Sequence, residues 1–381
     1  MNKSVFGLFF SLILSLVTLV GCTKKTDEIL VGEFGTLTGS EATFGQSTNK
    51  GLRMAFDEIN AAGGIKGKKI KLITYDNQGK NDESAAVVTR LITQDKVVAI
   101  IGEVASARTI AAAPIAQQYK VPMISPSSTN PKVTKDGEIN RDYVFRICFI
   151  DPFQGAVMAR FMIDNLKLKK VAILRDVKNE YSIGLADTFV KEVLARGGEV
   201  VIDVSYQSND IDFKAQLTQI KAKSPEAIFV PGYYTDAGLI TVQARQLGIK
   251  STFLGGDGWD SPKLHEIAKE AANGAYFSNH YATDSSEPIV QEFIQKYQKR
   301  FNELPDAMAA LGYDAGKVLA EALKNVKEFK PELIRNEIAK TKGFPGVTGN
   351  ITLDENRNAI KSAVVVRVDG NDKKFVTQIN P

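Results

Sequence analysis

Short apolar runs alternate with helical patterns along most of the chain. The first apolar run is ILVGEF at residues 29–34, and between Leu52 and Ile59 the apolar side chains recur at helical spacing until Gly63-Gly64 ends the pattern. Strands that alternate with helices of this length predict parallel sheets covered on both faces. The continuous apolar character of the strands agrees, because both faces of such a sheet are buried.

The alternation occurs twice, with a seam near residues 147–154. We expect strands at 29–34, 69–75, 97–102, 121–125, 171–174, 200–206, 227–230 and 252–255. We expect a first helix that ends near residue 63 and further helices at 82–94, 106–118, 181–196, 212–221 and 235–246. The remainder is mostly helical from Glu287 to Phe344 and closes with strand-like segments at 349–353, 363–368 and 375–379. Because 381 residues exceed what one core usually supports, two domains are expected.

The first 22 residues have the pattern of a lipoprotein signal peptide. Lys3 gives a positive start, residues 5–20 are apolar without an acidic residue, and Leu19–Cys22 (LVGC) resembles the bacterial lipobox. The run is shorter than the roughly 20 residues of a transmembrane helix. We predict that residues 1–21 are removed, that Cys22 carries a lipid and that residues 22–28 are a tether. An ordinary signal peptide with a chance cysteine is the alternative.

Charge and cysteine content narrow the function. The formal net charge of +4 is small for this length and mixed along the chain, which argues against a nucleic-acid partner. With Cys22 lipidated, Cys148 has no disulfide partner, and its apolar surroundings predict a buried small hydrophobic residue. The only histidines are His265 and His280, so no metal site is expected.

Catalytic motifs are missing from the sequence. No P-loop, dinucleotide fingerprint or Gly-x-Ser-x-Gly elbow has the required spacing, and His265 and His280 are interpreted as surface or packing residues. Polar residues instead follow the predicted strands, at the sheet edge where ligands bind in open α/β folds. Ser106 is expected to be the N-cap of a helix whose free N–H groups suit a carboxylate.

Three further loops follow strands in the same way: Pro126–Pro131, Gly232–Asp236 and Gly255–Trp259. Together these segments make the chain similar to the branched-chain amino-acid-binding proteins of ABC importers, the leucine/isoleucine/valine type of type I periplasmic binding protein. The resemblance extends from Ile29 to the C-terminus. Its motifs are Thr38-Gly39, Phe44-Gly45, Asp57–Gly67 (DEINAAGGIKG), Ala113–Ala116, Pro122–Pro126, Thr129–Pro131, Tyr181–Gly184 and Gly232-Tyr233.

The resemblance implies how the two charged ends of an amino acid are bound. Ser106 at the helix start, with Ser127 and Thr129 in the next loop, would hold the ligand carboxylate. Backbone oxygen of that loop and Asp257 would hold the ammonium group. Family members often have Glu at the last position, so this carboxylate is one methylene shorter. Tyr233 matches a tyrosine that contacts the same end of the ligand.

The resemblance also implies the walls of the side-chain pocket. Phe44 and Tyr181 match aromatic residues that line it from opposite lobes. Arg108 stands where small hydroxyl residues are usual. If it points into the cleft, it would bind an additional ligand carboxylate, which keeps acidic and amide ligands as candidates; if it points outward, it is a solvated helix residue.

The implied architecture is a pair of doubly wound α/β lobes joined by a three-strand hinge. Lobe one would comprise residues 29–148 and 280–354, and lobe two residues 149–279 and 355–381. We expect an extracytoplasmic monomer, anchored to a bacterial membrane, that binds an amino acid without a cofactor and delivers it to an ABC permease. The alternatives are a binder of amides, urea, aromatic acids or other small carboxylates, a ligand-sensing receptor module, and an enzyme.

Overall fold

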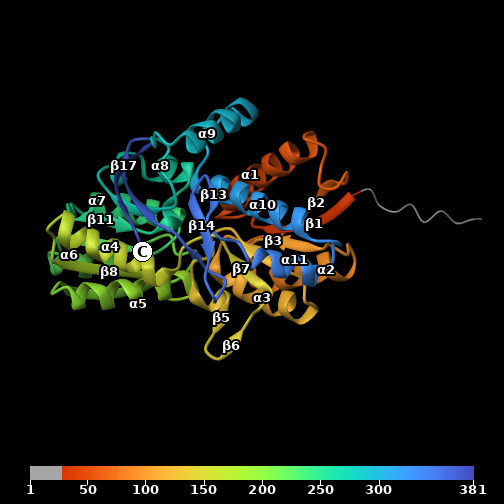
Figure 1. Cartoon of the computed structure of the whole chain (residues 1–381). Helices are drawn as coiled ribbons and strands as arrows, with labels where there is room; N and C mark the ends of the chain where they lie inside the picture. The colour runs from red at the N-terminus through yellow and green to blue at the C-terminus, as the bar shows by residue number, and fades with distance from the viewer. Residues whose placement is uncertain (1–27) are drawn as a thin grey trace, which may run out of the picture.

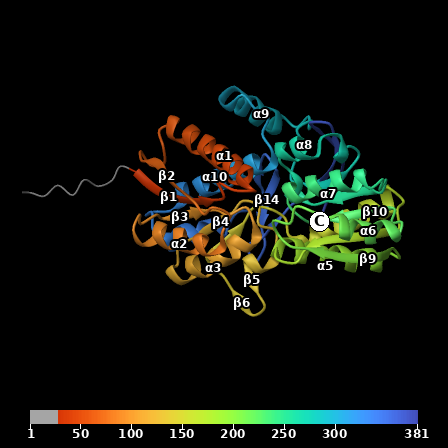
Figure 2. The same cartoon turned by 180° about the vertical axis from the view of Figure 1, so that it is seen from behind.

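The computed structural model describes residues 28–381. Its two larger β-sheets form the centres of two halves of the molecule. The predicted signal peptide and lipidation site at Cys22 lie outside the described residues. Figures 1 and 2 show two halves side by side, each with a sheet between helices. Within the described part of the chain, no helix is both long and apolar enough to cross a membrane.

The first sheet is fully parallel, with strand order β2-β1-β3-β4-β7. Helices α1 and α10 pack together, and α2 packs on α3. The bounds are β1 Glu28–Gly35, α1 Ala42–Ala61, β2 Lys69–Asp76, α2 Asn81–Thr93, β3 Ala99–Ile101, α3 Ser106–Tyr119, β4 Met123–Ser125 and β7 Val144–Arg146. This sheet therefore has the predicted doubly wound form.

The second sheet has the order β17-β16-β12-β11-β10-β8-β9. Its bounds are α4 Asp151–Arg160, β8 Lys170–Asp176, α5 Glu180–Ala195, β9 Glu199–Tyr206, α6 Lys214–Ala222, β10 Ala227–Val230, α7 Tyr234–Gln246, β11 Thr252–Gly255, η3 Asp257–Trp259, α8 Pro262–Ala268, β12 Tyr276–Asn279, β16 Ala363–Asp369 and β17 Asp372–Ile379. It is mixed rather than fully parallel, because β16 and β17 form an antiparallel hairpin beside β12.

The chain passes between the two halves three times. It crosses between β7 and α4, returns after β12 and crosses again between β15 and β16, which is the predicted three-strand hinge. The connecting elements are α9 Pro288–Phe301, α10 Ala307–Asn325, α11 Pro331–Ile338, β13 Phe344–Gly346, β14 Gly349–Leu353 and β15 Ala359–Ile360. Figure 1 shows β14 between the two halves.

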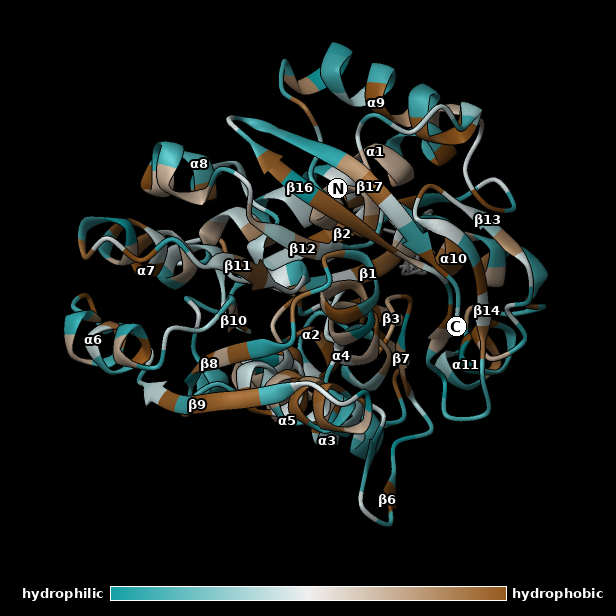
Figure 3. Ribbon diagram, turned by 90° about the vertical axis from the view of Figure 1, so that its left-hand side faces the viewer, coloured by the Kyte–Doolittle hydropathy of each residue, from teal (hydrophilic) through white to brown (hydrophobic). Residues whose placement is uncertain are grey.

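Apolar side chains fill the space between sheets and helices. Figure 3 shows the hydrophobic β16 and the largely hydrophilic turns of α9, which match the buried run AVVV and an exposed helix face. Cys148 is a free, fully buried thiol, as predicted. Burial raises its pKa to about 12, so it behaves as a core residue rather than a nucleophile.

Candidate ligand-binding site

The eight predicted ligand residues are all buried, and they lie around the junction of the two halves. Ser106 begins α3, Ser127 and Thr129 follow β4, and Phe44 lies in the first turn of α1. From the other half come Tyr181 at the start of α5, Tyr233 before α7 and Asp257 after β11. Each is placed by the carboxyl end of a strand, which is why residues distant in sequence meet here.

The Asp257 carboxylate is at the centre of the site. Its Oδ1 accepts hydrogen bonds from Gln154 Nε2 over 2.8 Å and from the Tyr181 hydroxyl over 3.0 Å. Its Oδ2 is 3.3 Å from the Ser127 hydroxyl and 3.0 Å from His280 Nε2. Asp257 therefore contacts both halves of the molecule from a buried position, where its carboxyl group suits a cationic ligand group.

Aromatic rings pack together beside Asp257. Tyr181 stacks on Tyr233 with a centroid distance of 5.3 Å and an interplanar angle of 10°. Phe44, from the first half, meets Tyr233 edge-on at 5.4 Å and Tyr234 at 5.0 Å. Asn179 caps α5 by accepting from Tyr181 N over 3.0 Å, which fixes where the Tyr181 ring starts. The predicted aromatic walls from opposite halves are thus adjacent.

The start of α3 supplies the anion-binding end, although one prediction about it was wrong. Ser106 is the first helical residue and Ala105 occupies the cap position, with no side-chain cap. The Ser106 hydroxyl instead accepts from Asn130 N over 3.3 Å and so ties α3 to the loop after β4. The first-turn N–H groups of Ala107 and Arg108 have no acceptor within the helix. A carboxylate placed there would be favoured by those groups and by the helix dipole.

Arg108 points toward the cleft rather than into solvent. Its Nη2 forms a short ion pair with Glu41, while its Nη1 is buried and has no partner among the described residues. Burial opposes the charge, but the nearby carboxylates of Glu103 and Glu41 outweigh it and raise the pKa of Arg108. The guanidinium is therefore charged. Its Nη2 is paired with Glu41, and its Nη1 is left as an unused donor.

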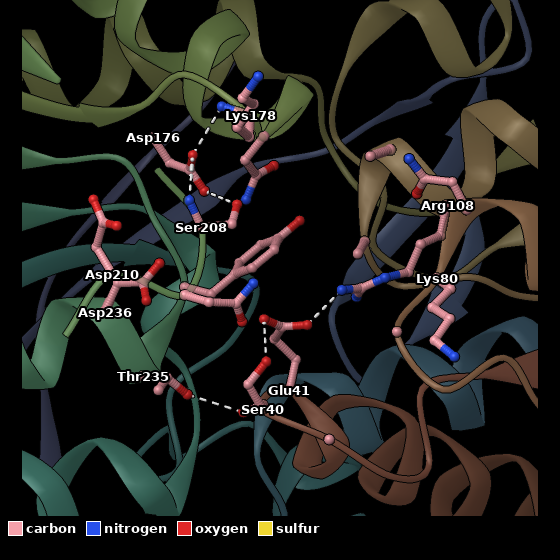
Figure 4. A pocket seen from close by; sticks show the side chains of 18 of the residues that line it. Ser40, Glu41, Lys80, Arg108, Asp176, Lys178, Ser208, Asp210, Thr235 and Asp236 are labelled. Carbon is pink, nitrogen blue, oxygen red and sulfur yellow. Dashed lines mark hydrogen bonds and ion pairs between the residues drawn. The ribbon is translucent and has the colours of Figure 1, made fainter. Parts of the chain in front are cut away.

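A cavity of about 840 Å³ opens between the halves next to this arginine. Figure 4 shows Arg108 on one side and Asp176, Lys178 and Asp236 on the other, with Glu41 at the base of the view. Of the predicted ligand residues, only Arg108 and Tyr233 line this cavity. The rest are covered, because the two halves are closed over them.

Hydrogen bonds between the halves hold this closed arrangement. The Ser40 carbonyl accepts from the Tyr234 hydroxyl over 2.8 Å and from the Thr235 hydroxyl over 2.9 Å. Asn130 Nδ2 donates to the Glu180 carbonyl over 2.8 Å on the far side of the cleft. These bonds, with the Ser127–Asp257 contact, enclose the site on several sides.

Three buried residues at the site were not predicted from sequence. His280 was interpreted as an ordinary surface or packing residue; it is a buried packing residue that stacks on Phe149 at 4.0 Å, but its 3.0 Å contact with Asp257 was not predicted. Burial lowers the pKa of His280, which favours the neutral ring as donor to Asp257. Gln154 and Asp151 lie on α4, directly after the apolar run at 144–150. The same polar-after-strand rule that selected the other loops applies to them.

A family profile and a curated relative assign the chain to the same family of proteins. A family profile described as "Periplasmic binding protein" matches residues 28–374. A Leu/Ile/Val-binding protein of Rhizobium johnstonii is 30% identical over 329 residues, covering 86% of this chain and 88% of that protein.

Solved structures of two relatives superpose over nearly the whole chain. A leucine-binding protein of Thermotoga maritima has a TM-score of 0.88 at 42% identity, covering 93% of this chain and 99% of its own. A branched-chain amino acid transporter substrate-binding protein of Streptococcus pneumoniae, solved with isoleucine, has a TM-score of 0.88 at 37% identity, covering 93% and 100%.

Proposed function

This chain belongs to the periplasmic binding protein family, and we propose that it captures an amino acid between its lobes and delivers it to an ABC permease. Branched-chain amino acids are the first candidates, because the relatives that resemble it are named for them. The observation that carries the proposal is Asp257, a buried carboxylate held by both halves between an aromatic pocket and a helix N-terminus.

The site has a matching group for each part of a zwitterion. The α3 start, with Ser106, Ser127 and Thr129, would bind the carboxylate of the amino acid. The free donor of Arg108 would bind an additional carboxylate, where the ligand has one. Asp257 and the carbonyl oxygens of the loop after β4 would bind the ammonium group. The rings of Phe44, Tyr181 and Tyr233 would enclose an apolar side chain, as expected for a small-molecule pocket with few polar groups.

Ligand capture would proceed by closure of two lobes. Lobe one comprises residues 29–148 and 280–354, and lobe two comprises 149–279 and 355–381. Ligand would enter the open cleft and bind lobe one first, and lobe two would then close and bring Asp257 and Tyr181 to it. Closure is favoured because the ligand contacts both lobes only in the closed state. No step of this scheme breaks a covalent bond, so the protein is a receptor rather than an enzyme.

The direct test is a thermal-melting screen of the purified monomer. The protein is unfolded and refolded to remove carried ligand, then melted with each of the twenty amino acids. A native-state ligand stabilises by RT ln(1 + [L]/Kd), about 2.7 kcal/mol at 100 times Kd. Upward shifts with leucine, isoleucine or valine support the proposal. A second set of amides, dicarboxylates and aromatic acids is melted in the same way. Shifts only with this second set would replace the ligand class, and turnover of any ligand would indicate an enzyme.

The location has its own test. We propose that Cys22 is lipidated and holds the receptor at the outer side of a bacterial membrane, close to its permease. Expressed in a bacterium, the wild-type chain should sediment with membranes, and Cys22→Ser should be released into the soluble extracytoplasmic fraction. Cys148→Ser, which leaves the lipobox intact, is the matched control. Equal membrane association of wild type and Cys22→Ser would contradict the anchor.

A further inference from the structure

Asp151 is a fully buried carboxylate without a hydrogen-bond partner. It is the first residue of α4, it is 0% exposed, and neither of its oxygens is paired among the described residues. Buried carboxylates are normally paired or hydrogen-bonded, because burying a bare charge is costly. An unpaired carboxylate buried at the junction of the two halves therefore points to a ligand group as its partner.

The surroundings of Asp151 connect it to the ammonium end of the site. Its backbone N–H donates to the Thr129 carbonyl over 2.9 Å. The Thr129 hydroxyl is also buried and makes no hydrogen bond of normal length among the described residues, but it lies close enough to Asp151 to lower the pKa of that carboxyl. A Cβ added at Gly184 would come within 3.4 Å of Asp151 Oδ2, so α5 approaches the carboxyl closely. Asp151 thus lies at the contact of the loop after β4 with α4 and α5.

Most of the charged and titratable groups that face Asp151 do not stabilise a negative charge on its carboxyl group. Asp257 on η3 is a second carboxyl group, and burial raises the pKa of both the Tyr181 hydroxyl on α5 and the Cys148 thiol after β7, so neither supplies a positive charge. Arg146 on β7 is the only cation among these groups. Its Nη1 donates to the Ser128 carbonyl over 2.7 Å and its Nη2 to the Pro131 carbonyl over 3.3 Å, while its Nε has no partner among the described residues. Burial, reinforced by Asp257, raises the pKa of Asp151 to about 8 despite Thr129 and Arg146.

We infer that Asp151 is a second carboxylate of the ammonium subsite and makes closure of the cleft depend on a positively charged ligand group. This inference rests on the proposed amino-acid binding. In the open cleft, water would solvate Asp151. Closure over a ligand without an ammonium group would bury the Asp151 carboxylate without a partner. A ligand ammonium group would instead be shared by Asp151 and Asp257. Two carboxylates also compensate for the short reach of Asp257.

The test compares leucine with 4-methylpentanoate, which keeps the carboxylate and side chain but lacks the ammonium group. Calorimetric affinities are measured at pH 7 for wild type, Asp151→Asn and the exposed control Asp212→Asn. We expect Asp151→Asn to bind leucine about tenfold more weakly and 4-methylpentanoate more tightly, so that the affinity ratio falls at least tenfold. Asp212→Asn should leave the ratio unchanged.

Measuring both affinities over a pH series distinguishes a binding role of Asp151 from a purely structural role, which would not change how affinity depends on pH. Closure over 4-methylpentanoate should drive a proton onto Asp151, so this ligand should bind more tightly as pH falls from 7.5 to 5.5. Leucine should show no such gain, and Asp151→Asn should abolish the difference. Melting of the ligand-free variants checks folding, and Asp151→Ser carries the same expectation if Asp151→Asn does not fold.

The outcomes separate the two proposals. If wild type binds leucine but Asp151→Asn keeps the wild-type ratio, or weakens both ligands equally, the inference is overturned and the receptor stands. If folded wild type binds no amino acid, the proposed function itself has failed.

Discussion

The Tyr181 hydroxyl donates to Asp257 Oδ1 over 3.0 Å and accepts from Gly258 N over 3.2 Å. A single ring therefore forms a wall of the pocket, through its stack on Tyr233, and fixes the carboxylate at its end. Because the bond spans α5 and the turn after β11, it ties the shape of the apolar pocket to the position of the charge.

Tyr181→Phe separates these two roles. It keeps the stacked ring but leaves Asp257 with one donor fewer, so amino-acid affinity should fall about tenfold, as hydrogen bonds to charged groups contribute about 1.5–3 kcal/mol. Calorimetric titration measures this loss. Tyr206→Phe is the matched control, because Tyr206 is equally buried and donates to Asp236 outside the ring stack. Equal losses in both variants would refute a specific role for Tyr181.

Glu41→Gln tests the charge state of Arg108. Removing the carboxylate that pairs with Arg108 leaves Glu103 as the remaining carboxylate near this cation and makes the edge of the cavity more positive. Binding of glutamate relative to leucine should then improve severalfold, since an opposite charge within a few ångströms favours the ionised ligand. Competition measurements with both amino acids provide the ratio. A ratio that stays at its wild-type value would place Arg108 outside the ligand's reach.

Glu33 should make stability depend on pH. Burial raises its pKa from 4.5 to about 7, partly offset by hydrogen bonds from Thr74 and Asn49. Between these values the native state binds more protons than the unfolded chain, so the free energy of unfolding falls as pH rises. Glu33→Gln should therefore be more stable than wild type at pH 8, by up to about 3 kcal/mol, and should lose this advantage at pH 4. Urea unfolding at both pH values measures it.

Tyr234→Phe should loosen the closed state. It removes the bond from the Tyr234 hydroxyl to the Ser40 carbonyl across the cleft but keeps the ring against Phe44. Ligand release should accelerate by about two- to tenfold, the range of one neutral hydrogen bond, with little change in association. Stopped-flow displacement measures both rates. The exposed Tyr119→Phe is the control, and an unchanged release rate would show that this contact does not hold the cleft closed.

The order of elements could be predicted from sequence because hydrophobic periodicity is a local property. The strands around residues 29–34, 200–206 and 227–230 and the three closing strands lie where the pattern placed them. The antiparallel hairpin β16–β17 could not be predicted, since the direction of a pairing depends on the route of the chain through the hinge.

Site residues could be predicted where polar motifs directly follow strands. The prediction failed where a contact joins segments that are distant in sequence. Ser127 and Asp257 were found by their position after strands, and Tyr181 was implied by the family resemblance; the structure brings all three into contact. His280 was missed because its partner Asp257 lies 23 residues away in a different loop, with no sequence pattern joining them. Asp151 was missed because residues 147–154 were interpreted only as the seam between the two βα series, although Asp151 follows a strand like the other polar loops.

The most direct test of the central claim is a calorimetric titration of ligand-stripped protein with leucine, isoleucine and valine, repeated with Asp257→Asn and the exposed control Asp212→Asn. The account predicts saturable one-to-one binding in wild type and in Asp212→Asn, with affinity at least a hundredfold lower in Asp257→Asn, because a buried charge pair with the ammonium group is lost. Folded wild type that binds none of the twenty amino acids, or an Asp257→Asn variant with undiminished affinity, would contradict it.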